Sequence, residues 1–157
     1  MAQPNNFLSP INFKFTSSET PNMEYLVQSV ILPGMELGTA IQPTPFVRLT
    51  NPGNISYGDL YVTFKMDEEL LAFNEIFDWM ERLGHPDNLD TQYSYLKSDL
   101  RVIVMSSSVR PMMDFTYTDC YPTNISPLSF DSTLTDVNYI STTVGFTFNR
   151  IIRNSTY

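Results

Sequence analysis

The sequence predicts a mainly β protein, an antiparallel barrel or sandwich with one helix packed on its flank. Three observations support this fold class. Several segments alternate apolar and polar residues, which is the period of a strand with one buried face. One segment repeats apolar residues every three or four positions, as an amphipathic helix does. Prolines, 11 in all, and glycines separate these segments, and 157 residues are most simply one domain spanning 1–157.

Strand patterns recur along the chain after a polar stretch at 1–9, which we expect to be a loose arm. The clearest is at 60–66, where Leu60, Val62, Phe64 and Met66 alternate with polar or tyrosine positions. A second run, 24–34, is apolar at consecutive positions, so we expect cover on both faces or a bulge. The remaining strand-like runs are 11–16, 100–106, 113–119 and 137–149.

Residues 35–58 contain prolines and glycines between only short β-like runs. This pattern predicts a long, projecting hairpin or loop. Long ordered loops are usually functional or interfacial.

The strongest helix signal covers 67–84. Asp67 is expected to cap the helix, and Glu68 and Glu69 suit the positive end of its dipole. Gly84 and Pro86 mark its end. An apolar stripe is expected to pack on the barrel: Leu70, Phe73, Ile76, Phe77, Met80 and Leu83. The opposite face carries Glu75, Asp78 and Glu81.

No residue pattern suited to catalysis, to a cofactor or to a metal is present in the sequence. A single Cys120 and a single His85 offer no cluster of metal ligands, and a bystander thiol is the better interpretation of Cys120. Asp114 and Asp119 point to opposite faces of a regular strand. The formal net charge of −8 disfavours a generic nucleic-acid binder, which needs a basic surface. We therefore predict that the chain is not an enzyme and has no cofactor.

The order of these elements resembles the tail tube proteins of contractile-tailed, T4-like bacteriophages over nearly the whole chain. An early NFKF strand leads to a strand ending in Leu32-Pro33-Gly34, then to the loop at 35–58, and then to a strand-to-helix join with the cluster Phe77-Asp78-Trp79. The closing third is the most specific part. It contains Pro122-Thr123-Asn124 as a turn, Leu128-Ser129-Phe130-Asp131 as a short strand, and a terminal strand ending Val144-Gly145-Phe146-Thr147-Phe148.

The resemblance implies a virion protein whose hexameric rings stack into the inner tail tube, assembled in the bacterial host cytoplasm. Its implied partners are other copies of itself, the contractile sheath protein, and baseplate and tape-measure proteins. DNA would pass through an acidic lumen that repels phosphate. The acidic residues Glu75, Asp78 and Glu81 would face the sheath. The residues expected to reach an adjacent ring or subunit are Met35, Glu36, Leu37, Pro43, Pro45, Phe46, Asn51 and Pro52.

Other functions remain open at this point. A baseplate tube initiator, a neck or tube terminator, and a secretion-system tube subunit would share the fold. A different class is a monomeric β-domain that binds a small ligand or carbohydrate, or a small hydrolase, with Tyr93, Tyr95 and Tyr117 as candidate site residues. Copy number in a particle and oligomeric state in solution discriminate between these possibilities.

Overall fold

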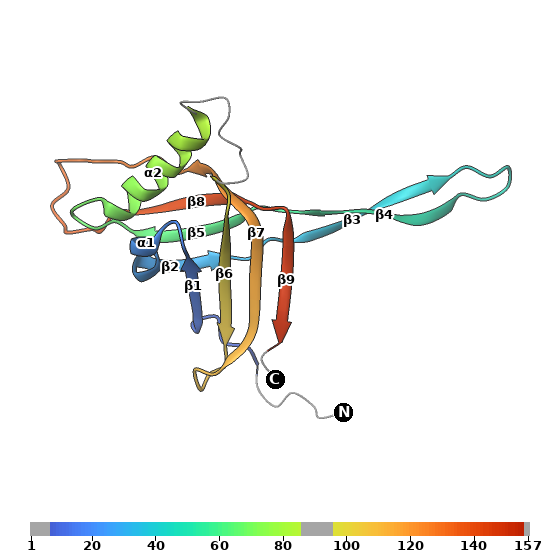
Figure 1. Cartoon of the computed structure of the whole chain (residues 1–157), viewed down its shortest axis with the longest axis horizontal. Coiled ribbons are helices and arrows are strands. Elements are labelled where there is room, and N and C mark those ends of the chain that lie inside the picture. Colours follow the sequence, from blue (N-terminus) through green and yellow to red (C-terminus); the bar gives the residue numbers. More distant parts are fainter. Residues whose placement is uncertain (1–6, 86–95, 156–157) are drawn as a thin grey trace.

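The computed structural model of the chain describes residues 7–85 and 96–155. A body of antiparallel strands carries two helices on one side, and a two-stranded hairpin extends far from it (Figure 1). The strands of the body are β1 (Phe13–Ser17), β2 (Val27–Ile31), β5 (Leu60–Lys65), β6 (Ser98–Met105), β7 (Pro111–Ile125), β8 (Ser141–Thr147) and β9 (Arg150–Ser155). The hairpin is β3 (Met35–Gln42) with β4 (Leu49–Tyr57), and the helices are α1 (Pro21–Leu26) and α2 (Leu71–Gly84).

Strand β7 joins the two halves of the body, because its first part and its second part pair with different strands. Its first part lies between β6 and β9, and its second part pairs with β8. The full path is β1-β6-β7-β8-β5-β2, with β9 added on β7. Between the two parts, Asp119 has a φ of 55°, a conformation that Asp adopts more readily than most residues. Asn149 Nδ2 donates to Asp119 Oδ2 at 3.1 Å, which helps to hold this bend.

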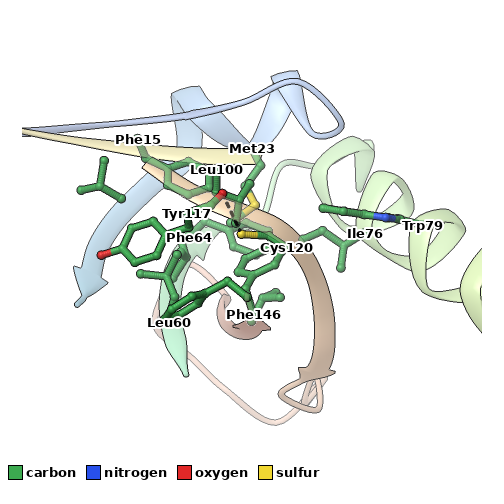
Figure 2. Packing of buried hydrophobic residues seen from close by; sticks show 14 of the residues in the cluster. Phe15, Met23, Leu60, Phe64, Ile76, Trp79, Leu100, Tyr117, Cys120 and Phe146 are labelled. Carbon is green, nitrogen blue, oxygen red and sulfur yellow. Dashed lines mark hydrogen bonds between the residues drawn. The ribbon is translucent and has the colours of Figure 1, made fainter. Parts of the chain in front are cut away.

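The core lies where the two halves face each other and α2 covers them (Figure 2). Alternation along β5 puts Leu60, Val62 and Phe64 inside, all fully buried. From β8, Phe146 meets Trp79 of α2 with ring centroids 6.0 Å apart. The Trp79 indole Nε1–H donates to the Leu96 carbonyl at 2.6 Å, so the one polar atom of this large side chain is satisfied.

Helix α2 begins four residues later than the sequence pattern predicted. Leu70 precedes it with a φ of 54°, so the chain leaves the helical region there. Asp67 still acts on the helix start, because its Oδ2 accepts from the Leu71 N–H at 3.1 Å. Glu68 and Glu69 lie before the helix rather than in its first turn. The predicted capping residue is therefore used, but from a turn that precedes the helix.

The buried face of α2 is also rotated relative to the predicted stripe. Its buried residues are Ala72, Ile76 and Trp79. Phe77, expected in the interface, is 52% exposed and stacks on Phe73 with centroids 6.2 Å apart. Of the other predicted packing residues, Ile76 is fully buried, whereas Leu70, Phe73, Met80 and Leu83 are half-buried.

Three further predictions were wrong. Residues 21–26 form helix α1, where part of a strand at 24–34 was expected, although a bulge does interrupt β2 between Val27 and Ser29. Strand β7 continues through 122–124, where a turn was expected, and no strand forms at 128–131. The C-terminal segment, for which no strand was predicted, forms strand β9.

The predicted arm at 1–9 falls mostly outside the described residues, since the description starts at Phe7. No helix in the described ranges is long and apolar enough to cross a membrane.

Candidate assembly surfaces

The hairpin β3–β4 projects from the body as a two-stranded ribbon (Figure 1). Its strands pair from Met35 opposite Tyr57 to Gln42 opposite Leu49. Its base is closed by a hydrogen bond from Gly58 N–H to Gly34 O at 3.0 Å. Gly38 and Gly53 meet at a register shift midway, where a Cβ on Gly53 would lie 3.0 Å from the Gly38 backbone. Close backbone approach therefore requires glycine at that point.

Apolar side chains are exposed along the whole ribbon. Every residue of β3 is exposed, and so are all eight predicted contact residues, Met35, Glu36, Leu37, Pro43, Pro45, Phe46, Asn51 and Pro52. The large apolar side chains are between 50% and 96% exposed: Met35, Leu37, Ile41, Phe46, Val47, Leu49 and Ile55. An exposed apolar surface of this extent is typical of a protein contact surface.

Open strand edges form a second candidate surface. In the described part of the chain, β1, β2 and β9 each pair with one strand only, on one side. The other edge of each strand presents unpaired backbone groups, which can pair with another chain. Three strands of the body can therefore each accept a strand from another chain.

The acidic residues of α2 gather in a groove between α2 and the segment that precedes α1. Glu75, Asp78 and Glu81 line it together with Glu19, Arg82 and His85. Glu75 Oε1 accepts from Asn22 Nδ2 at 2.6 Å, so this carboxylate ties α2 to α1. Arg82 pairs with Glu19 at 3.3 Å. Asp78 and Glu81 are exposed. Of the three predicted sheath-facing residues, these two have carboxylates that a partner can reach, whereas Glu75 is bonded to Asn22.

The connection 126–140 is a second apolar surface, and sequence reasoning missed it. Its exposed large side chains are Phe130, Leu134, Val137 and Tyr139. Asp131 Oδ1 orders part of the loop by accepting from the Thr133 N–H at 2.9 Å and from the Thr133 hydroxyl at 2.6 Å, and these bonds lower the Asp131 pKa. The signal that could have revealed this surface is the spacing of its apolar residues, which fits neither a strand nor a helix.

Two of the segments that carry the resemblance to tail tube proteins, 122–124 and 144–148, are in contact. Asn124 Oδ1 accepts from Gly145 N–H at 2.9 Å, and the Thr123 hydroxyl donates to Gly145 O at 3.2 Å. These contacts fall at a register shift between Pro122 and Asn124 in β7. Pro122 is compatible with the strand because prolines in sheets concentrate at bulges and edges. The segment 122–124 is therefore part of β7 and is hydrogen-bonded to β8.

The described residues hold no arrangement that matches a catalytic or metal site. Cys120 is fully buried and its pKa is raised to about 12 by burial, so it is a protonated thiol at neutral pH. Its Sγ–H donates to Tyr117 O at 3.2 Å. His85 is exposed at the end of α2. In the ranges 7–85 and 96–155, no three His, Cys, Asp or Glu residues are placed to bind one metal ion.

The remaining candidate residues have structural surroundings. Asp114 is buried and pairs with Arg101, whose Nε and Nη2 lie 2.7 and 2.5 Å from Asp114 Oδ2. This contact raises the pKa of Arg101 further. Tyr117 is buried in the core (Figure 2) and is only 1% exposed. Tyr93 and Tyr95 lie outside the described residues.

Solved structures with the same fold come from contractile injection systems. A chain in the cryo-EM structure of the anti-feeding prophage tube-terminating cap matches with a TM-score of 0.73, at 11% identity, over 99% of this chain and 96% of that chain. A chain of the sheath-tube complex of an extracellular contractile injection system, PVC, matches with a TM-score of 0.72, at 14% identity, over 97% and 94%.

A further match is Hcp1 from Flavobacterium johnsoniae, with a TM-score of 0.54, at 14% identity, over 95% of this chain and 96% of that chain. No protein-family model and no curated protein sequence matches the chain. The likeness is therefore one of fold, and it extends over almost the whole length of each chain. The chain therefore has the fold of these chains from the tube-terminating cap, the sheath-tube complex and Hcp1.

Proposed function

We propose that this chain is a structural subunit whose hexameric rings stack into the inner tube of a contractile tail. The observation that carries this proposal is the hairpin β3–β4. A two-stranded ribbon is marginally stable alone in water, and this one exposes apolar residues at 50–96% along its length. A partner that covers the ribbon explains both its length and its composition.

Ring formation gives the open edges of β1, β2 and β9 a similar explanation. A neighbouring copy that pairs with such an edge satisfies its backbone groups, and rotational closure leaves no edge free. The contact between copies within a ring is then largely a sheet contact, and the hairpin is available to reach a second ring.

The acidic composition fits a tube that conducts DNA without retaining it. A net charge of −8 repels phosphate, whereas a basic lining would bind it. The outer partner is a contractile sheath, which Asp78 and Glu81 contact from the exposed face of α2. Baseplate and tape-measure proteins complete the set of partners, in a bacteriophage virion assembled in the host cytoplasm.

Charge reversal at Asp78 and Glu81 tests the sheath contact. The double variant Asp78→Lys/Glu81→Lys is expected to weaken sheath binding and to leave tube formation intact, because neither side chain has a hydrogen-bonded partner among the described residues. Glu75 is left unchanged, since it bonds to Asn22. Loss of tubes in this variant would place the acidic face at a contact between subunits instead.

A tube initiator or terminator is the second candidate, and the match to a tube-terminating cap favours it as much as the match to a sheath-tube complex favours the first. Copy number in purified particles separates them. A tube subunit forms many rings per particle, and an initiator or terminator forms one.

Excision of the hairpin tests the assembly role directly. The hydrogen bond between Gly58 and Gly34 marks a natural cut, so residues 35–57 can be replaced by a short Gly-Ser linker without opening the body. Electron microscopy and light scattering of the full chain are expected to show rings or tubes. The shortened chain is expected to keep its thermal transition and to lose tubes.

Two outcomes would contradict the proposal. One is a full chain that stays monomeric at high concentration, which would favour a ligand-binding β-domain. The other is tubes of normal length from the shortened chain. A matched control replaces only the exposed turn residues 107–109 and keeps Ser106, whose carbonyl accepts from Asn12 Nδ2, so it should change neither stability nor assembly.

A further inference from the structure

We propose that the tip of the hairpin in one copy docks into a groove at the opposite end of a copy in the next ring, with Phe46 as the apolar anchor and Arg48 as the charged one. This inference rests on the proposed tube function and deepens it by naming the receiving surface. The receiving groove lies between the connection 66–70 and the connection 126–140.

The groove has an apolar wall and an acidic rim. Its wall includes Leu70, Leu128, Phe130 and Tyr139, and its rim carries Asp67 and Glu68. Its volume is about 250 Å³. That is smaller than typical sites for drug-sized ligands, which span about 300–1,000 Å³, but sufficient for one aromatic side chain. Phe130 and Tyr139 are 73% and 74% exposed, so the wall is uncovered in the single chain.

The acidic rim has capacity for a cation. Asp67 uses Oδ2 to accept from the Leu71 N–H, and its Oδ1 is buried and has no hydrogen-bond partner among the described residues, so Glu68 is the carboxylate that is open to a partner. Glu68 is exposed. Lys65 lies over the Tyr139 ring, 5.0 Å from its centroid, and the two carboxylates outnumber it.

The hairpin tip is complementary to this groove. Phe46 is 96% exposed at the turn between β3 and β4. The turn is held by Thr44, whose Oγ1 accepts from the Val47 N–H at 3.2 Å. Arg48 follows directly and is the only cationic residue in 35–58. Aromatic residues, phenylalanine included, and arginine are both enriched at protein interfaces.

The positions of the two surfaces favour stacking. The hairpin leaves one end of the long axis of the molecule, and the connections 66–70 and 126–140 lie at the other end (Figure 1). A tip that fits the far end of another copy makes a head-to-tail contact, which repeats without limit along one direction. This geometry produces a stack and does not produce a closed pair.

A charge-swap experiment tests the pairing of tip and groove. Arg48→Glu and Glu68→Arg are each expected to raise the protein concentration needed for tube formation by about tenfold, because each places like charges in contact. The double variant Arg48→Glu/Glu68→Arg is expected to return close to wild type. Glu68 is chosen over Asp67, whose carboxylate supports the start of α2. Sedimentation of tubes and their length in electron micrographs are the measurements.

Arg110→Glu is the matched control, since it makes the same charge change on an exposed turn away from both surfaces. Equal effects of Arg48→Glu and Arg110→Glu, or losses that simply add in the double variant, would overturn the pairing while leaving a tube-forming wild type and its proposed function intact. A wild-type chain that forms no rings or tubes would overturn both.

Cysteine cross-linking tests the partner copy. Val47→Cys with Asn138→Cys places one thiol at the tip and one in the groove wall. Oxidised tubes are expected to give ladders of linked chains on a non-reducing gel, and isolated rings are expected to give none. Ladders from isolated rings would assign the groove to a neighbour in the same ring and overturn the contact between rings. The pair Val109→Cys/Asn138→Cys serves as control, because Val109 lies on the exposed turn after β6.

Discussion

Strands β5 and β3 are both antiparallel strands with alternating apolar residues, yet their surroundings are opposite. In β5, Leu60, Val62 and Phe64 are fully buried between β8, β2 and the helices. In β3, every residue is exposed. Backbone pairing is similar in the two strands, so the difference lies in what covers the side chains. The body of the protein is stabilised by its own core, whereas the hairpin needs another chain to bury its apolar face.

The largest effect is expected in the core of the body. Phe146→Ala removes a fully buried ring that contacts Trp79. We expect a loss of about 3–5 kcal/mol in the free energy of unfolding, measured by urea denaturation of the unassembled subunit. Phe146→Leu, which keeps most of the volume, should cost less than about 1.5 kcal/mol. Similar stabilities for the alanine variant and wild type would show that the body is not held by this core.

The next effect is expected where β7 meets β8. A Cβ on Gly145 would collide with Asn124 Oδ1, the atom that accepts the Gly145 N–H. Gly145→Ala is expected to cost about 1–3 kcal/mol, because the amide must move and this buried N–H loses its partner. In an Asn124→Ala background the same change should cost less, since the collision is gone. Purely additive costs in this double-mutant cycle would contradict the contact.

An intermediate effect is expected at alkaline pH. Burial raises the pKa of Cys120 and of Tyr117 to about 12, from ordinary values of 9.0 and 10.0. Between pH 9 and 12 the folded chain therefore binds more protons than the unfolded chain, and the free energy of unfolding falls as pH rises. Each group contributes at most about 1.4 kcal/mol per pH unit. Well below pH 9, at pH 8 and lower, both groups are protonated in either state and the stability changes little.

Urea denaturation at pH 8, 10 and 11 measures this slope. Cys120→Ala should reduce the slope of the free energy of unfolding against pH by up to about 1.4 kcal/mol per pH unit, the contribution of one proton, because the buried thiol is then absent. Equal slopes for the two chains between pH 9 and 11 would contradict the assigned environment of Cys120. A thiol reagent at pH 8 gives a second measurement, since the native Cys120 should react only on unfolding.

The smallest effect on the subunit is expected at the hairpin tip. Phe46→Ala should change the free energy of unfolding by less than about 0.5 kcal/mol, because the ring is 96% exposed in the single chain. The same variant should lose tubes. A destabilised subunit would show that the tip contacts its own body, and unaltered tubes would show that the ring is not an anchor. Phe46→Ala should therefore affect assembly and Phe146→Ala the free energy of unfolding, which separates a contact between chains from a contact within the core.

Sequence pattern predicted most of the body but not its joins. The strand at 60–66 and the helix around 71–84 were predictable because a buried face imposes a clear period. Helix α1 was missed, since six residues are too few to show such a period. Strand β9 was missed because its one covered side is backbone pairing with β7, and most of its side chains are exposed. Pro122 favoured a turn over the bulge that accommodates it.

The candidate surfaces were predictable to different degrees. Residues 35–58 were identified by composition, and their exposure followed from the structure. The acidic face of α2 was predicted by spacing, but the tie between Glu75 and Asn22 was not, because it joins residues 53 positions apart. The groove beside 126–140 could not be predicted, since it exists only where that connection meets residues 66–70.

The sequence by itself determined the mainly β class, the single strong helix, the acidic charge and the presence of a long insertion, because these depend on composition and on short-range periodicity. Tertiary structure alone decided which strands share β7, which face of α2 is buried, and where the hairpin and the groove lie relative to each other. Those features depend on contacts between residues far apart in the chain, which local patterns do not encode. The assembly surfaces belong to this second group, since each is defined by what the fold leaves uncovered.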